Sequence, residues 1–266
     1  MARSTYISEN LTQNQIKLML LLDEYELDIF TLNELKNIAA NQFDDVNELV
    51  ENLVHKNILS RIERGKYCRS NFRDEKVIGT HLVDDGAIAY WSALNYHGLT
   101  EQFPNSVFIQ TTKVKSSKEV FGVHYNFIKI TPRKQKGYIK EGYGNHGFKI
   151  TDIEKTIVDC FDLPQHSGGY AELIRAFDIM TLSSTKMIEY SQSINNRAAI
   201  KRMGFICELL NKKGMKTFVR FAKGFVNHTY NLFDPLGPIR GKHDAEWRLR
   251  LNISKSDIHG ITNKLY

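Results

Sequence analysis

Apolar residues recur at helical spacing between Thr31 and Asn57, which predicts two consecutive helices. Thr31 and Glu34 form a capping box, in which each side chain satisfies a free backbone N–H, and apolar residues follow at helical spacing. The pattern breaks at residues 41–43. A second helical pattern then runs from about Asp44 to Asn57 and places five apolar side chains on one face: Val46, Leu49, Val50, Leu53 and Val54.

A hairpin is predicted directly after these two helices. The segments 58–62 and 66–69 flank Gly65, and glycine readily supplies the positive φ that a hairpin turn needs. Before the helix pair, another helix is predicted from about Thr12 to Glu24, with a buried stripe of Ile16, Met19 and Leu20. Three short helices followed by a two-stranded ribbon are typical of a winged helix-turn-helix, which we predict over residues 1–75.

Residues 76–266 are predicted to form a second domain that mixes strands and helices. It opens at Asp84 and Asp85, because acidic residues suit a helix N-terminus and apolar residues follow at a spacing of three: Ile88, Trp91 and Leu94. Gly98 would end this helix. β-Branched and aromatic residues then predict strands at 107–111, 125–130 and 148–150.

The remainder of the second domain is predicted to be largely helical. Thr151 and Glu154 form a second capping box, and the helix after them carries four apolar residues: Ile153, Ile157, Val158 and Phe161. Three further helical patterns follow, at 170–177, 185–193 and 198–210. The predicted fold class is therefore α+β, an N-terminal winged helix-turn-helix followed by a larger mixed α/β C-terminal domain.

Composition and charge narrow the functional class. With 42% hydrophobic and 25% charged residues, the 266-residue chain is that of an ordinary globular protein, and it has no apolar run of the roughly 18 residues that a membrane span needs. The N-terminus lacks an export signal, so we expect a cytoplasmic protein. Its three cysteines are far apart, which disfavours a disulfide framework and a zinc site.

The net charge of +6 is distributed unevenly. Residues 1–75 contain nine basic and thirteen acidic residues, whereas the rest contains 27 basic and 17 acidic residues. A basic protein favours an acidic partner, of which nucleic acid is the commonest. Within the predicted winged helix, basic residues concentrate in the wing: Arg61, Arg64, Lys66, Arg69 and Arg73. They are the candidate phosphate contacts, and three polar residues are the candidate base readers: Gln42, Asn47 and Asn52.

The outer face of the predicted recognition helix complicates base reading. It carries Asp44, Glu48 and Glu51, whose carboxylates would repel DNA phosphates. The main electrostatic contact is therefore predicted to come from the wing together with a lysine-rich segment of the second domain: Lys113, Lys115, Lys118, Lys129, Arg133, Lys134, Lys136 and Lys140. The alternative for that segment is a solubilising sheet edge that prevents strand pairing. A second basic segment contains Lys212, Lys213, Lys216, Arg220 and Lys223.

The motifs for catalysis are weak. Residues 142–147 match a dinucleotide-binding pattern by letter, but a predicted strand follows where a helix N-terminus should hold the phosphates, so we interpret them as a hairpin loop. One acidic set could hold a metal: Asp152, Glu154, Asp159 and Asp162. The first two are better explained as partners of a helix N-terminus. No phosphate-binding loop or nucleophile motif is present, so we expect neither catalysis nor a cofactor.

Several segments, in order, resemble the AbiEi family of antitoxins. They are the wing 64–67, the stretches 90–99, 150–160 and 201–210, and the tail from 232–238 through Gly241 to Trp247 and Arg248. The resemblance covers nearly the whole chain. It implies an antitoxin of a type IV phage-defence toxin–antitoxin pair, whose winged helix represses its own operon by binding inverted repeats in double-stranded DNA.

The resemblance also implies that the C-terminal domain counters a nucleotidyltransferase-like toxin without binding it stably, and the basic segment 212–223 is the candidate region for that activity. Two other classes stay open from the residues alone. One is a protein-interaction module in which the acidic winged helix binds a basic partner. The other is a nucleotide-acting enzyme that uses the carboxylates of Asp152, Asp159 or Asp162.

Overall fold

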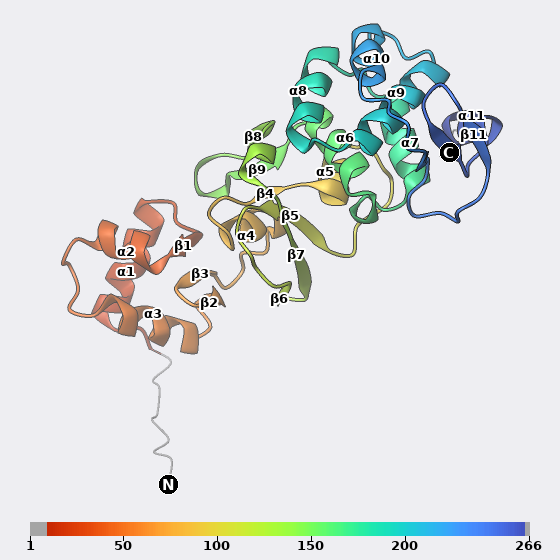
Figure 1. The fold of residues 1–266 in the computed structure, drawn as a ribbon. Helices are drawn as coiled ribbons and strands as arrows, with labels where there is room; N and C mark the ends of the chain where they lie inside the picture. Colours follow the sequence, from red (N-terminus) through yellow and green to blue (C-terminus); the bar gives the residue numbers. More distant parts are fainter. Residues whose placement is uncertain (1–9, 264–266) are drawn as a thin grey trace. The chain divides into compact units, whose positions relative to one another are not determined.

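The computed structural model describes residues 10–263 and has the predicted α+β fold, a winged helix followed by a larger α/β domain (Figure 1). The chain divides into two compact units. The first contains the residues up to Asp84 together with 140–148, and the second contains 85–139 and the residues from Lys149 onward. The first unit therefore extends past the predicted boundary at residue 75, and it takes in a loop that we had assigned to the second domain.

The first unit has the elements of a winged helix. Its helices are α1 (Gln13–Glu24), α2 (Leu32–Ala39), α3 (Val46–His55) and α4 (Glu75–His81), and its strands are β1 (Ile29–Thr31), β2 (Leu59–Glu63) and β3 (Lys66–Arg69). The capping box of Thr31 and Glu34 is present at the start of α2, and Gly65 turns the β2–β3 hairpin with φ of 74°. β1 was not predicted, and it pairs antiparallel with β3 to complete a three-stranded sheet.

The buried face of α1 differs from the prediction. Ile16 and Leu20 are 44% and 61% exposed, whereas Leu18, Leu21 and Leu22 lie in the core of the first unit. These three leucines form their own set at helical spacing, so the sequence offered two overlapping stripes. Packing against α3 selects the leucine stripe.

The loop of residues 142–147 belongs to the first unit and holds the start of β1. It is part of the hairpin between β8 (Tyr138–Glu141) and β9 (Phe148–Thr151), as predicted, and includes a short 3-10 turn, Gly144–His146. The Asn145 side-chain oxygen accepts from the N–H groups of Asp28 and Ile29, both at 2.8 Å, and its amide donates to the Ile29 carbonyl at 2.7 Å. His146 contacts the Asp28 carboxylate at 2.6 Å.

The second unit is built on a mixed sheet with the strand order β6-β7-β5-β4-β9-β8. The remaining strands of this sheet are β4 (Ala87–Ile88), β5 (Val107–Thr111), β6 (Lys118–Val120) and β7 (Val123–Lys129). β5 is parallel to β7 and antiparallel to β4, and β4 is parallel to β9. The predicted strands at 107–111, 125–130 and 148–150 are thus confirmed, with small shifts at their ends.

Helices make up most of the rest of the second unit. They are α5 (Tyr90–Tyr96), α6 (Ile153–Asp162), α7 (Tyr170–Ile179), α8 (Ser184–Ile194), α9 (Arg197–Leu209), α10 (Lys216–Lys223) and α11 (Lys255–Asn263). Short 3-10 turns occupy Pro132–Lys134 and Pro164–His166. α6, α7, α8 and α9 enclose the main hydrophobic core of this unit, which includes Phe161, Phe177, Met203 and Phe205.

Two predicted helix starts in this unit are wrong. Ile88 lies in β4, and α5 begins only at Tyr90, because Asp85 accepts hydrogen bonds from Thr111 and Thr112 instead of capping a helix. Although burial raises it, these hydrogen bonds lower the pKa of Asp85 to about 2. Thr151 ends β9, and Asp152 rather than Thr151 caps α6 by accepting from the Lys155 N–H.

The C-terminal segment forms a small second sheet against α9. Its strands are β10 (Asn231–Leu232), β11 (Lys242–Asp244) and β12 (Leu249–Leu251), in the order β10-β12-β11. Lys201 on α9 is fully buried and donates to the carbonyls of Thr229 and Arg248, and burial lowers its pKa to about 8. Trp247 is 1% exposed and donates its indole N–H to Glu208 at 2.6 Å.

We expect Asn145→Ala to loosen β1 without unfolding the first unit. The Asp28 and Ile29 N–H groups would lose their acceptor, which costs on the order of 1 kcal/mol for each hydrogen bond lost. Their amide hydrogen exchange, followed by NMR, should accelerate about fivefold or more relative to the core amides of Val50 and Leu53. Asn33→Ala, at an exposed position on α2, is the control. Equal exchange in both variants would contradict a holding role for Asn145.

Candidate nucleic-acid interface

The turn between α2 and α3 places the polar residues predicted to read bases. Ala40 and Asn41 have φ of 38° and 67°, a left-handed pair that reverses the chain sharply. Asp45 then caps α3 by accepting from the N–H groups of Asn47 and Glu48, at 2.8 and 3.1 Å. Of the three candidate base readers, Gln42 and Asn47 are exposed, whereas Asn52 is half-buried.

The acidic face of α3 is partly neutralised by the wing. The Glu51 carboxylate accepts a hydrogen bond from the Tyr67 hydroxyl at 2.6 Å and lies 3.8 Å from the Arg61 guanidinium. Burial and the neighbouring Glu51 raise the pKa of Tyr67 to about 12. Glu51 therefore links the helix to the wing, whereas Glu48 on α3 and Asp44 in the turn before it remain exposed.

The five wing cations fall into two groups. The Lys66 ammonium donates to the carbonyls of His81 and Leu82, and Arg69 forms an ion pair with Asp23 at 2.5 Å, so both charges are used inside the first unit. The Arg69 side chain is only 13% exposed. The other three wing cations are exposed at the surface, although two of them also have a contact: Arg61 lies 3.8 Å from Glu51, Arg73 donates to the Phe72 carbonyl, and Arg64 is at the hairpin turn.

The lysine-rich segment runs from the end of β5 into β8, and several of its cations have partners in the structure. Lys134 contacts Asp162 at 2.5 Å, Lys136 contacts Glu189 at 3.0 Å, and the Lys115 ammonium lies 5.4 Å from the centre of the Phe127 ring. Lys118 is half-buried on β6. The exposed members are Lys113, Lys129, Arg133, Lys136 and Lys140.

The basic segment near α10 is divided in the same way. Lys212 is half-buried and donates to the Asp178 carbonyl at 2.7 Å, and Lys223 lies between Glu208 and Glu246, at 2.7 and 2.5 Å. Lys213, Lys216 and Arg220 are exposed. Lys216 and Arg220 lie four residues apart on α10 and so share one face, whereas Lys213 lies in the turn before the helix.

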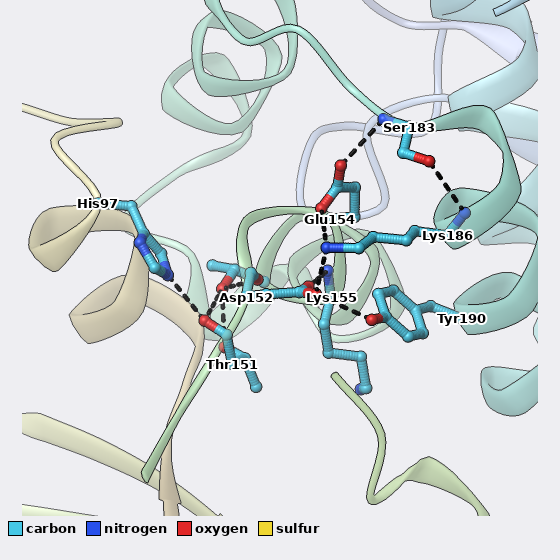
Figure 2. A network of polar contacts seen from close by, with 9 residues as sticks. His97, Thr151, Asp152, Glu154, Lys155, Ser183, Lys186 and Tyr190 are labelled. Carbon is cyan, nitrogen blue, oxygen red and sulfur yellow. Dashed lines mark hydrogen bonds and ion pairs between the residues drawn. The ribbon is translucent and has the colours of Figure 1, made fainter. Parts of the chain in front are cut away.

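The carboxylates considered for a metal site are engaged in the packing of α6. Asp152 accepts from Tyr190 at 2.9 Å and from Lys186 at 3.0 Å, and Glu154 accepts from the Ser183 N–H at 2.9 Å (Figure 2). Asp162 is bound to Lys134. These contacts join α6 to α8 and to the 3-10 turn that contains Lys134.

Asp159 is the fourth carboxylate, and it is paired with Lys155 one helical turn earlier. Both side chains are almost fully buried, and burial raises the pKa of Asp159 although Lys155 opposes that shift. Within residues 10–263, no group of three or more His, Cys, Asp or Glu side chains is arranged to hold a metal ion. The same part of the chain contains no helix that is long and apolar enough to cross a membrane.

Comparison with known proteins supports the fold. No family model matches the chain, and no curated protein matches it. Among solved structures, the crystal structure of the RV2827C protein from Mycobacterium tuberculosis is similar, with a TM-score of 0.63 over 97% of each chain and 12% sequence identity. A match over both units at such low identity shows that the two chains share a fold.

The contact between Tyr67 and Glu51 predicts a specific titration. Glu51→Gln removes the negative charge that disfavours the tyrosinate, so the pKa of Tyr67 should fall from about 12 toward its ordinary value of about 10, while burial keeps it above that value. NMR of ring-labelled tyrosine as a function of pH measures this shift. Glu48→Gln on the same helix should leave the Tyr67 titration unchanged. An unchanged pKa in Glu51→Gln would show that the contact does not form in solution.

Proposed function

We propose that this protein is a non-enzymatic DNA-binding regulator that represses its own operon as the antitoxin of an AbiE-like toxin–antitoxin pair. The observation that carries the proposal is that three cations in and after the wing of a winged helix are exposed: Arg61, Arg64 and Arg73. Cations on the wing suit phosphates beside a groove, and their contacts set the position of the protein on the duplex.

The residues around the turn support a limited role for base reading. Gln42 and Asn47 are exposed at and near the N-terminus of α3, where side chains of a recognition helix reach base edges. The Glu51 carboxylate is compensated by Arg61 and Tyr67, which reduces the repulsion that the sequence suggested. Asp44 and Glu48 still face outward, so most of the affinity in this proposal comes from phosphate contacts.

The antitoxin part of the proposal rests on the ordered resemblance to AbiEi antitoxins. It implies binding to inverted repeats in the operator and inhibition of a nucleotidyltransferase-like toxin without a stable complex. We assign this second activity to three exposed cations on α10 and in the turn before it: Lys213, Lys216 and Arg220. Each of the four carboxylates near α6 has a structural contact, which favours a non-enzymatic protein.

The wing tests the DNA-binding part. Arg61→Ala with Arg64→Ala should lower the affinity for duplex DNA from upstream of the gene by about tenfold and reduce the slope of log K against log salt concentration by roughly two, because two phosphate contacts are lost. Fluorescence anisotropy at several salt concentrations measures both.

The matched control is Lys213→Ala with Lys216→Ala, which removes the same charge from α10 and the turn before it. An equal loss of DNA affinity in both double variants would show that the overall charge, and not the wing contact, determines binding. If the protein instead binds a basic protein through Asp44 and Glu48, duplex binding should be absent and a complex should form without DNA.

Growth rescue tests the antitoxin part. Expression of this chain should restore the growth of cells that express a nucleotidyltransferase-like gene from the same operon. Lys213→Glu with Lys216→Glu should reduce rescue, whereas the wing double variant should retain it because repression and rescue use different units. Growth that is not restored by the wild-type chain would contradict the antitoxin role and leave the DNA-binding role intact.

A further inference from the structure

The small C-terminal sheet carries a basic and aromatic surface that the proposed function does not use. β12 lies between β10 and β11, with Arg250 directly opposite His243 and Leu249 opposite Asp244. Leu249 and Phe233 are fully buried, so the sheet is anchored in the core of the second unit. The anchored strands give their polar side chains a rigid base.

Arg248 has a strained backbone next to β12. Its φ is +50°, a conformation that residues other than glycine and asparagine rarely adopt and that concentrates at functional sites. The Arg248 carbonyl accepts from the Asn231 N–H at 3.1 Å and from the buried Lys201 ammonium at 3.3 Å. These two bonds hold the conformation in place.

The strained backbone presents the Arg248 side chain to Tyr230. The guanidinium lies 5.2 Å from the centre of the Tyr230 ring and donates to its hydroxyl at 3.1 Å. The ring of His243 also packs against Tyr230, with centres 4.7 Å apart and an angle of 76° between the planes. Tyr230 and His243 are both exposed. The three side chains form a π-rich group at the surface, which we call the ring cluster.

Positive charge beside the ring cluster is not compensated. Arg240 and Lys242 are exposed, and neither forms an ion pair within residues 10–263. The nearby acids are occupied: Asp244 binds Lys255 at 3.1 Å, and Glu246 binds Lys223 at 2.5 Å. Lys242 at the start of β11 and Arg240 just before it are therefore positioned to attract anions.

His243 of the ring cluster also lines a cleft of about 590 Å³ formed by β11, β12 and the start of α11. Arg240, Lys242, Ser254 and Ser256 are further lining residues. Two acids line it as well: Asp244 is paired with Lys255, whereas Asp257 accepts from the Ser254 hydroxyl and keeps its charge. The volume falls in the range of small-ligand sites and is sufficient for one nucleotide unit.

We propose that this cleft binds single-stranded nucleic acid. Arg240 and Lys242 contact phosphates, and an unpaired base lies against His243, the member of the ring cluster that lines the cleft. Proteins that bind single strands combine cations that follow the backbone with aromatic side chains on which bases stack. A duplex keeps its bases stacked inside, so it can use the cations but not the ring cluster. The site lies in the second unit, so it stands or fails separately from DNA binding by the wing.

The test measures binding of fluorescein-labelled 12-nucleotide single strands of RNA and DNA to the full-length protein by anisotropy. Arg240→Glu with Lys242→Glu should weaken binding at least tenfold. His243→Ala should weaken it about tenfold, in the range measured for the loss of a stacking side chain. His243→Ala should change the affinity for a 12-base-pair duplex by less than twofold. Circular dichroism verifies that each variant is folded.

The matched control is Lys213→Glu with Lys216→Glu, which makes the same change of charge on α10 and the turn before it. If it weakens single-strand binding as much as Arg240→Glu with Lys242→Glu does, the protein attracts nucleic acid through its overall charge, and the proposed site is wrong. No measurable binding of either single strand by the wild-type protein also overturns it. If His243→Ala weakens duplex and single-strand binding equally, the preference for single strands is wrong.

Discussion

The attachment of β1 within the first unit depends on hydrogen bonds between Asn145 and the backbone of Asp28 and Ile29. β1 contributes only three residues to the winged-helix sheet and pairs on one side with β3. Such a short strand closes too few hydrogen bonds to be stable alone. A side-chain amide that donates to one backbone group and accepts from two others continues the pairing that a neighbouring strand would have given. The winged helix is therefore completed by residues more than one hundred positions away in the chain.

Desolvation explains why the basic residues of this chain divide into two populations. Lys66, Arg69 and Lys201 are placed where their charges meet carbonyls or carboxylates, because a cation removed from water is costly unless it is hydrogen-bonded. Such cations hold elements together and are not available to a ligand. Arg64 and Arg240 lie at exposed turns and keep their charge for a partner. The number of basic residues in the sequence therefore overestimates the number that can contact phosphate.

The polar contacts around α6 show the same principle within the second unit. Asp152 caps the helix and accepts hydrogen bonds from Tyr190 and Lys186 (Figure 2). Lys155 and Asp159 pair in the interior. A buried pair of this kind adds little net stability, because desolvation offsets much of the attraction between the charges. Replacing only one of the two residues would leave an uncompensated charge in the interior. The two must therefore be buried together, on the face of α6 that turns inward. These carboxylates are accounted for by packing.

Local sequence was sufficient for the elements whose signals are local. The Thr31 capping box, the Gly65 turn and the strands β5, β7 and β9 depend on neighbouring residues, and short-range periodicity and turn chemistry identify them. Only the tertiary structure decided which stripe of α1 is buried. It also decided that Asp85 binds Thr111 and Thr112 instead of capping a helix, and that Arg69 forms an internal ion pair with Asp23. Each of these depends on a partner far away in the chain, and periodicity carries no information about distant partners.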